Sequence, residues 1–276
     1  MVKIVLNILS SFNNQIIVIM KKLITLLFMC SLVLASQAQE VLQLPSGFSG
    51  GKTVWIIRAG ASFSGVSGKG IDAQEDAWAK NKWSGSFGRA FGGNLSIGFN
   101  KTFGSSPIYW GMDIGVAMRG YKTDASWNRS ASSSISGGYD SHTKSEKTTL
   151  TAYSAQLSPI NIGYKYKING NMAVDIHVGG FASYDFAGSL KSESYDHIYI
   201  TGKYGTNDKT TENSNSTKIG NIDSYRKYDF GVIGGLGFWY GHFNVDFSYQ
   251  RGFVSMYDSD NSYFNNKLLV RVGYAL

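Results

Sequence analysis

Beyond residue 52, apolar and polar residues alternate with a period of two over long stretches, which predicts β-strands rather than helices. The clearest stretch is 228–249, where apolar, aromatic or glycine residues take every second position on both sides of Gly241. This pattern predicts a β-hairpin with a tight turn. Asp229 and Asp246 fall on its other face, where a soluble core would have to supply partners for both carboxylates.

The same alternation recurs in six other segments, so eight strands are predicted in all. The other six are 53–63, 91–103, 108–121, 150–168, 172–186 and 266–276. In the segment 150–168 the apolar face changes parity at Ser158 and Pro159. We expect a β-bulge there, because a strand tolerates proline at a bulge.

The predicted connections alternate between short turns and long polar loops. The short turns are 104–107, 169–171 and Gly241, and the long loops are 64–90, 122–149, 187–225 and 252–265. Aromatic residues gather near both ends of the strands. Apolar residues outside, charged residues inside, aromatic girdles and long loops on one side are together typical of outer-membrane barrels.

We therefore predict an all-β fold, an eight-stranded antiparallel up-and-down transmembrane β-barrel over 53–276, located in the bacterial outer membrane with both chain ends periplasmic. A secreted soluble β-sandwich or lipocalin-like barrel also alternates and is the competing interpretation. Beyond Ala38 no run approaches about 18 consecutive apolar residues, which excludes a spanning helix. Any membrane role must then come from strands.

The N-terminal segment has the features of a secretory signal. From Met20 the chain carries two lysines, an apolar run and an Ala-x-Ala-like end, which predicts a signal peptide over 20–38. We expect translation to start at Met20, residues 1–19 to be an overextended start, and 39–52 to form a periplasmic lead. The alternative, one long membrane anchor, would place both lysines at its centre, at a high cost.

Composition changes the picture little. Charged residues make up 16% of the chain, and the net charge of +7 falls to +4 when residues 1–38 and their three lysines are removed. No basic cluster is visible, so nucleic acid is not expected as a partner. The single cysteine, Cys30, lies inside the predicted signal peptide. The mature chain therefore needs no disulfide.

Four short motifs lie in the predicted strands. They are Asp-Phe-Gly at 229–231 leading to Gly-Leu-Gly at 235–237, Val-Asp-Phe-Ser-Tyr-Gln-Arg-Gly at 245–252, Ala-Gln-Leu-Ser-Pro-Ile at 155–160 leading to Tyr-Lys-Tyr at 164–166, and Leu-Val-Arg-Val-Gly-Tyr at 269–274. Together they resemble the Bacteroidetes outer-membrane β-barrel domain family (PorT-like) over 53–276. That family usually closes on an aromatic residue, whereas this chain has Leu276. The resemblance implies an eight-stranded barrel and no single activity.

An eight-stranded barrel is only wide enough for its own side chains, so we predict a plugged polar lumen. The inward positions carry charges of both signs, which can satisfy one another as a paired network. The expected members of this lumen network are Arg58, Asp113, Arg119, Lys165, Asp175, His177, Asp229, Asp246 and Arg271.

Chemistry beyond this network has weak support. Asp175 and His177 share an inward face, and some small outer-membrane barrels are lipid-modifying enzymes or proteases, but no nucleophile motif accompanies them. The segment 258–262 has oxygen ligands at alternating positions but lacks the glycine and the distant glutamate of an EF-hand. His142 and His197 fall in separate predicted loops. We therefore predict no enzymatic activity, no cofactor and no metal.

The predicted loops are the expected working surface. The first holds Trp78 and Trp83 with a short helix around 72–82, and exposed aromatics among polar residues can bind glycans or proteins. We expect a structural or interaction role through the loops or periplasmic turns, supporting secretion or the envelope. The partners would be outer-membrane lipid and a surface or periplasmic protein or glycan. A narrow passive channel for small solutes is the alternative, and a lipid-modifying enzyme comes third.

Overall fold

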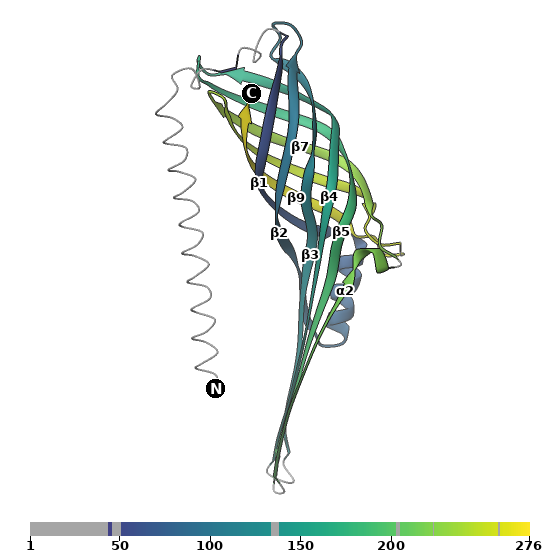
Figure 1. Ribbon diagram of the computed structural model, residues 1–276. Coiled ribbons are helices and arrows are strands. Elements are labelled where there is room, and N and C mark those ends of the chain that lie inside the picture. The colour runs from purple at the N-terminus through teal and green to yellow at the C-terminus, as the bar shows by residue number, and fades with distance from the viewer. Residues whose placement is uncertain (1–43, 46–50, 134–137, 203–204, 223, 259) are drawn as a thin grey trace.

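The computed structural model describes residues 44–45, 51–133, 138–202, 205–222, 224–258 and 260–276 (Figure 1). The predicted signal peptide (20–38) and the expected overextended start (1–19) lie outside these residues. The elements in the described part are β1 Thr53–Ser67, α2 Lys69–Lys80, β2 Ser84–Thr102, β3 Ile108–Ser133, β4 Gly138–Lys167, β5 Met172–Gly202, β6 Gly205–Lys218, a 3-10 turn Ile219–Asn221, β7 Tyr228–Tyr240, β8 Phe243–Ser255 and β9 Phe264–Ala275.

Eight of these strands close into a barrel, as the sequence predicts. Each wall strand pairs antiparallel with its neighbours in the order β1, β2, β3, β4, β5, β7, β8, β9, and β9 pairs back with β1. The predicted hairpin is β7 and β8, and its turn contains Gly241 with a φ of 56°, a conformation that favours glycine. The predicted bulge is also present, because the register between β4 and β5 shifts between Leu157 and Ile160.

The outer surface of the barrel is apolar. Side chains in the middle of the wall are widely exposed, for example Ile176 at 59% and Val178 at 60%, which would be costly in water. Exposed aromatics lie at both ends of the wall, including Tyr164, Tyr166, Phe238 and Tyr240 near the short turns and Tyr184, Phe230, Tyr249 and Phe253 at the other end. An apolar band between two aromatic girdles matches a lipid bilayer. None of the helices in the described part is long and apolar enough to cross a membrane.

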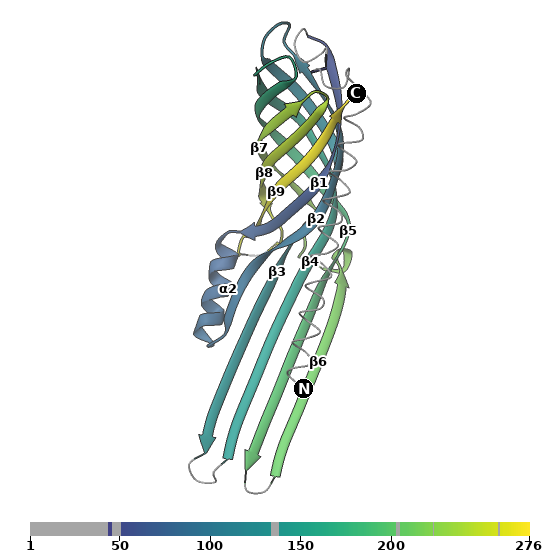
Figure 2. The same cartoon turned by 90° about the vertical axis from the view of Figure 1, so that its left-hand side faces the viewer.

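Two of the predicted loops are wrong, because most of 122–149 and 187–225 is strand. β3, β4 and β5 continue far past the barrel wall, and β6 pairs with the outer part of β5. The result is a four-stranded antiparallel sheet, here called the blade, formed by 122–133, 138–149, 189–202 and Gly205–Lys218 (Figure 2). Polar residues cover both of its faces, so the alternation of apolar and polar positions that marks the barrel strands is missing here.

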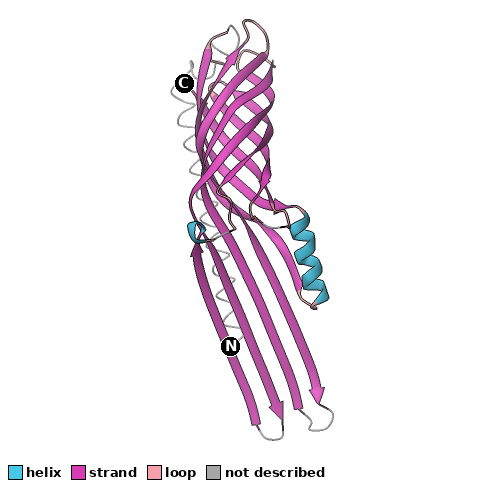
Figure 3. Cartoon of the chain, turned by 90° about the vertical axis from the view of Figure 1, so that its right-hand side faces the viewer, coloured by secondary structure: helices cyan, strands magenta, loops and turns pink. Residues whose placement is uncertain are grey.

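The predicted loop 64–90 contains the helix α2, which confirms the short helix expected there. The helix lies beside the base of the blade, at the end of the barrel opposite the short turns (Figure 3). In outer-membrane barrels the short turns are periplasmic and the long connections extracellular. The blade and α2 therefore lie on the extracellular side.

Candidate functional site

The candidate site is the barrel lumen, where inward side chains form two ion-paired networks. In the network nearer the short turns, Arg58 Nη1 lies 2.5 Å from Asp113 Oδ1 and Arg271 Nη2 lies 2.7 Å from Asp246 Oδ1. Asn161 also donates to Asp113, at 3.1 Å. These four charged residues come from β1, β3, β8 and β9, which lie within one continuous run of the wall, in the order β3, β2, β1, β9, β8.

Asp175 of β5 brings three further side chains into this network. It accepts hydrogen bonds from the Tyr109 hydroxyl at 3.0 Å and from the Trp239 indole at 2.6 Å. The Nδ1 atom of His177 lies 3.0 Å from the same carboxylate. The Lys165 ammonium lies over the Tyr109 and Trp239 rings, 4.6 and 5.2 Å from their centroids, which are cation–π distances.

Ser248, His177 and Asp175 are aligned in the manner of a hydrolytic triad. Ser248 Oγ lies 3.4 Å from His177 Nε2, while His177 Nδ1 faces Asp175. Ser248 is nevertheless only 1% exposed, and its hydroxyl donates to Asp246 at 2.5 Å and accepts from Arg271 at 3.2 Å. The adjoining cavity has a volume of about 10 Å³, which is too small for a substrate. The alignment is part of the ion-paired network.

The second network lies nearer the extracellular end and centres on Arg119 of β3. Its guanidinium lies 2.6 Å from Asp185 and 3.2 Å from Asp229. Asp185 also accepts hydrogen bonds from Ser154, at 2.7 Å, and from the Tyr225 hydroxyl. Every charged group in this network therefore has an oppositely charged partner.

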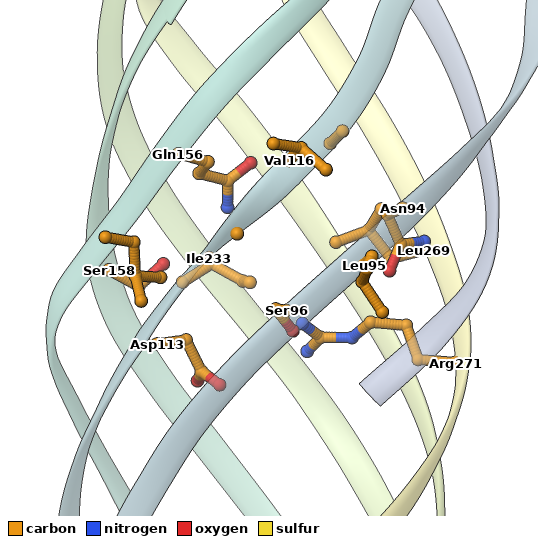
Figure 4. Close-up of a pocket in the computed structure, with 13 residues that line it drawn as sticks. Asn94, Leu95, Ser96, Asp113, Val116, Gln156, Ser158, Ile233, Leu269 and Arg271 are labelled. Carbon is orange, nitrogen blue, oxygen red and sulfur yellow. The ribbon is translucent and has the colours of Figure 1, made fainter. Parts of the chain in front are cut away.

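Apolar layers separate and seal these networks. Their buried members are Val54, Ile56, Ala173, Trp239 and Ala275 at the periplasmic end, Phe181, Ile233 and Leu269 in the middle, and Tyr121, Leu150, Ala152, Ile219, Tyr225 and Met256 at the extracellular end. A cavity of about 20 Å³ beside the middle layer is lined by Asp113, Gln156 and Arg271, among others (Figure 4). It has room for about one water molecule. Apolar layers and ion-paired networks thus alternate along the described lumen.

The structure places all nine residues of the expected lumen network inside the barrel. Six of them meet in the network nearer the short turns, Lys165 lies beside it, and Arg119 meets Asp229 in the other. The expected lumen network lacks five buried members, although alternation puts them on inward faces: Asp185, Tyr109, Trp239, Ser248 and Lys267. Tyr225 carries no such signal, because it lies in an irregular segment between the 3-10 turn and β7.

The candidate metal ligands are dispersed. His142 bonds Asp196 at 2.6 Å, and His197 bonds Asp208 at 2.8 Å, each within the blade. The segment 258–262 is described only in part, because residue 259 lies outside the described residues. Among the residues that the structure describes, no group of three or more His, Cys, Asp or Glu side chains could hold a metal ion.

The blade presents a row of aromatic rings on one face. Tyr195, His197 and Tyr199 alternate along β5 and so share a face. The Tyr139 ring of β4 lies 6.4 Å from the Tyr199 ring, and Tyr139 is 44% exposed. Half-exposed tyrosines among serines and threonines are typical of recognition surfaces.

Among solved structures, the chain is similar to several outer-membrane proteins. Ail, the attachment invasion locus protein of Yersinia pestis, in complex with the heparin analogue sucrose octasulfate, is 12% identical, with 82% of this chain and 99% of that chain covered and a TM-score of 0.29. Neisserial surface protein A is 11% identical, with 80% and 96% covered and a TM-score of 0.32. OprG from Pseudomonas aeruginosa is 12% identical, with 83% and 98% covered and a TM-score of 0.33.

A search of curated proteins gives no match. The family model described as "Outer membrane protein beta-barrel domain" matches residues 37–258, which is most of the chain. The closed barrel and its apolar outer band agree with that match. The chain therefore belongs to the outer-membrane protein β-barrel domain family and is a protein of the bacterial outer membrane.

Proposed function

We propose that the barrel is a plugged anchor and that the blade with α2 is the surface through which the protein interacts with a partner. The observation that carries this proposal is the continuity of β3, β4 and β5 from the barrel wall into the blade. A transmembrane strand needs about 9–11 residues, whereas β4 has 30 and β5 has 31. Most of this additional length lies outside the membrane, where an interaction surface has to be.

The sealed lumen supports an anchor rather than a transporter. Three apolar layers cross it, and the cavities beside them have volumes of about 20 and 10 Å³. The finer assignment to the Bacteroidetes PorT-like branch belongs to this proposal too and rests on the motifs at 155–166, 229–237, 245–252 and 269–274. In that setting the partner of the blade is a protein at the cell surface, and the role is support of secretion or of the envelope.

A shortened blade tests the proposal. Removing 128–143 and 197–210 and joining Trp127 to Lys144 and Asp196 to Thr211 by Asn-Gly turns keeps each remaining pair in register, because these residues are cross-strand partners. Liposomes carrying either form would be applied to immobilised surface proteins of the envelope. We expect saturable binding by the natural protein and its loss in the shortened form, with the barrel still folded by heat-modifiability on a gel.

Planar-bilayer recordings provide the second test, directed at the alternative of a narrow passive channel. The anchor proposal predicts no discrete conductance steps from pure protein. Discrete steps, or equal partner binding by the shortened form, would contradict it.

A further inference from the structure

A cleft with a volume of about 400 Å³ opens at the extracellular mouth, between α2 and the base of the blade. This volume lies within the range of about 300–1,000 Å³ that is usual for small-molecule sites. Its lining includes the aromatic residues Trp78, Phe87, Tyr257 and Tyr263 and the polar residues Gln74 and Glu146. They come from α2, β2, β4 and the connection between β8 and β9, so the cleft exists only in the folded chain.

The aromatic rings form one continuous row. The Trp78 and Phe87 centroids are 5.6 Å apart, those of Phe87 and Tyr263 are 6.5 Å apart, and those of Tyr263 and Tyr257 are 5.7 Å apart. The Tyr257 hydroxyl also bonds the Tyr121 hydroxyl at 2.8 Å, which ties the row to β3. The row therefore offers an extended aromatic surface along the cleft.

Two of these rings pack directly against glycine residues, where a larger side chain would not fit. A Cβ atom on Gly85 would lie 2.3 Å from the Trp78 ring, and one on Gly70 would lie 2.4 Å from the Tyr263 ring. The Gly70 amide donates to the Ser262 carbonyl at 3.0 Å, which joins the start of α2 to the connection between β8 and β9. Because the rings are held before any ligand arrives, little ordering cost would be added on binding.

The polar groups of the cleft decide between ligand classes. Gln74 offers an amide, Thr123 and Thr148 offer hydroxyls, and Glu146, the single charged residue among the lining residues, is exposed. A purely apolar ligand would desolvate these groups without bonding them. A phosphate or sulfate group would be repelled by the Glu146 carboxylate. A sugar ring can contact the aromatic residues and also bond the polar groups of the cleft. Its C–H groups contact aromatic faces, while its hydroxyls bond amide, hydroxyl and carboxylate groups.

We propose that this cleft binds a short neutral saccharide. This inference rests on the proposed interaction role and goes beyond it, since it assigns a second ligand to a separate site at the base of the blade. The aromatic row contacts the faces of the sugar rings, and Gln74 and Glu146 bond their hydroxyls.

Isothermal titration calorimetry on the full chain, refolded in lauryldimethylamine oxide, tests the proposal. Maltosides are avoided because their headgroups are themselves saccharides. The probes are maltotriose and diacetylchitobiose, with choline and a sulfated disaccharide as contrasting ligands. We expect saturable binding of at least one neutral probe, and no binding of choline or of the sulfated sugar.

Variants locate the site. Trp78→Ala and Glu146→Gln are expected to weaken binding at least tenfold and severalfold, respectively. The control is Trp127→Ala, whose ring lies against His142 further along the blade, and it should bind as the natural protein does. Gln74→Ala, on an exposed helix turn, is a second test should Trp78→Ala disturb α2.

Three outcomes would overturn the proposal: no neutral probe binds, choline or the sulfated sugar binds in its place, or a neutral probe binds equally well to the Trp78, Glu146 and Gln74 variants. The shortened blade retains every residue of the cleft and should bind the saccharide unchanged. Loss of partner binding by that form and loss of saccharide binding by the cleft variants are therefore separate results.

Discussion

Single carboxylates determine how the lumen is filled, because a buried charge without a partner is far more costly than a paired one. Asp246 shows this, with Arg271 at 2.7 Å, Ser248 at 2.5 Å and His177 at 3.5 Å. These partners come from β5, β8 and β9. The carboxylate therefore connects the neighbouring strands β8 and β9 to β5 through side chains inside the barrel.

Asp246→Asn is predicted to destabilise the barrel by about 3 kcal/mol, since it leaves the buried Arg271 without a counter-charge. Urea unfolding in lipid vesicles, followed by Trp fluorescence, measures the change. Asp124→Asn is the matched control, because Asp124 and Lys147 are exposed and 3.5 Å apart, and such pairs contribute about 0–1 kcal/mol. Equal effects of the two substitutions would contradict the role given to the lumen network.

Asp196 of the blade gives a prediction for pH. Desolvation acts to raise the pKa of its carboxyl, but the hydrogen bond from His142 and the charge of Lys144 outweigh it, so the pKa lies below the usual 3.8. A lowered folded pKa means that the stabilisation is fully present above about pH 4. It is lost as the pH falls through the folded pKa.

Hydrogen exchange of blade amides should therefore quicken as the pH is lowered through that range, after correction for the intrinsic exchange rate. His142→Gln and Lys144→Gln together should reduce this pH dependence. A pH dependence that is the same in the double variant would show that the Asp196 pair does not stabilise the blade.

Among the elements, the barrel strands could be predicted and the blade strands could not. The wall strands face lipid on one side and the lumen on the other, so burial imposes alternation on residues such as Ile114, Val116 and Arg119. The blade meets water on both faces, and nothing requires alternation in β6, where nearly every residue is exposed. Its content of serine, threonine and asparagine is typical of a loop as well.

The candidate site could likewise be predicted only in part. The inward positions of Asp175 and Arg271 follow from parity, but which charges pair depends on the register between strands distant in sequence. The cleft depends on how α2 lies against the blade, which the alternation of the strands does not encode. The sequence shows that Trp78 is an aromatic residue in a polar loop, but it does not predict that its ring packs against Gly85.

Pairing predicts an order of opening within the blade. β4 and β5 are bonded on both sides, whereas β6 is bonded by β5 alone and 127–133 of β3 by β4 alone in the described sheet. Amides of these two edges should exchange faster than those of β4 and β5 in the blade, and those of the barrel wall should exchange more slowly still. Mass-spectrometric hydrogen exchange in micelles checks this order, and uniform exchange across the blade would contradict it.

For the whole molecule, closure of the wall removes free strand edges from the membrane, and apolar side chains pack across the middle of the lumen. We predict heat-modifiability on a denaturing gel, with the unboiled protein migrating differently from the boiled one. The shortened blade should keep this behaviour, because its cuts lie beyond the barrel. Identical migration of boiled and unboiled protein would show that the barrel does not resist unfolding by the gel's detergent at room temperature.

The unbroken strands also have a mechanical consequence. A partner that pulls on the tip of the blade, away from the cell, applies force along β4 and β5, parallel to the strands. The hydrogen bonds between them, from Tyr139 with Thr201 down to Lys167 with Ala173, then resist shear together instead of opening one after another. Tension at the tip is shared along the whole ladder into the membrane, which suits a tether that has to withstand flow or drag.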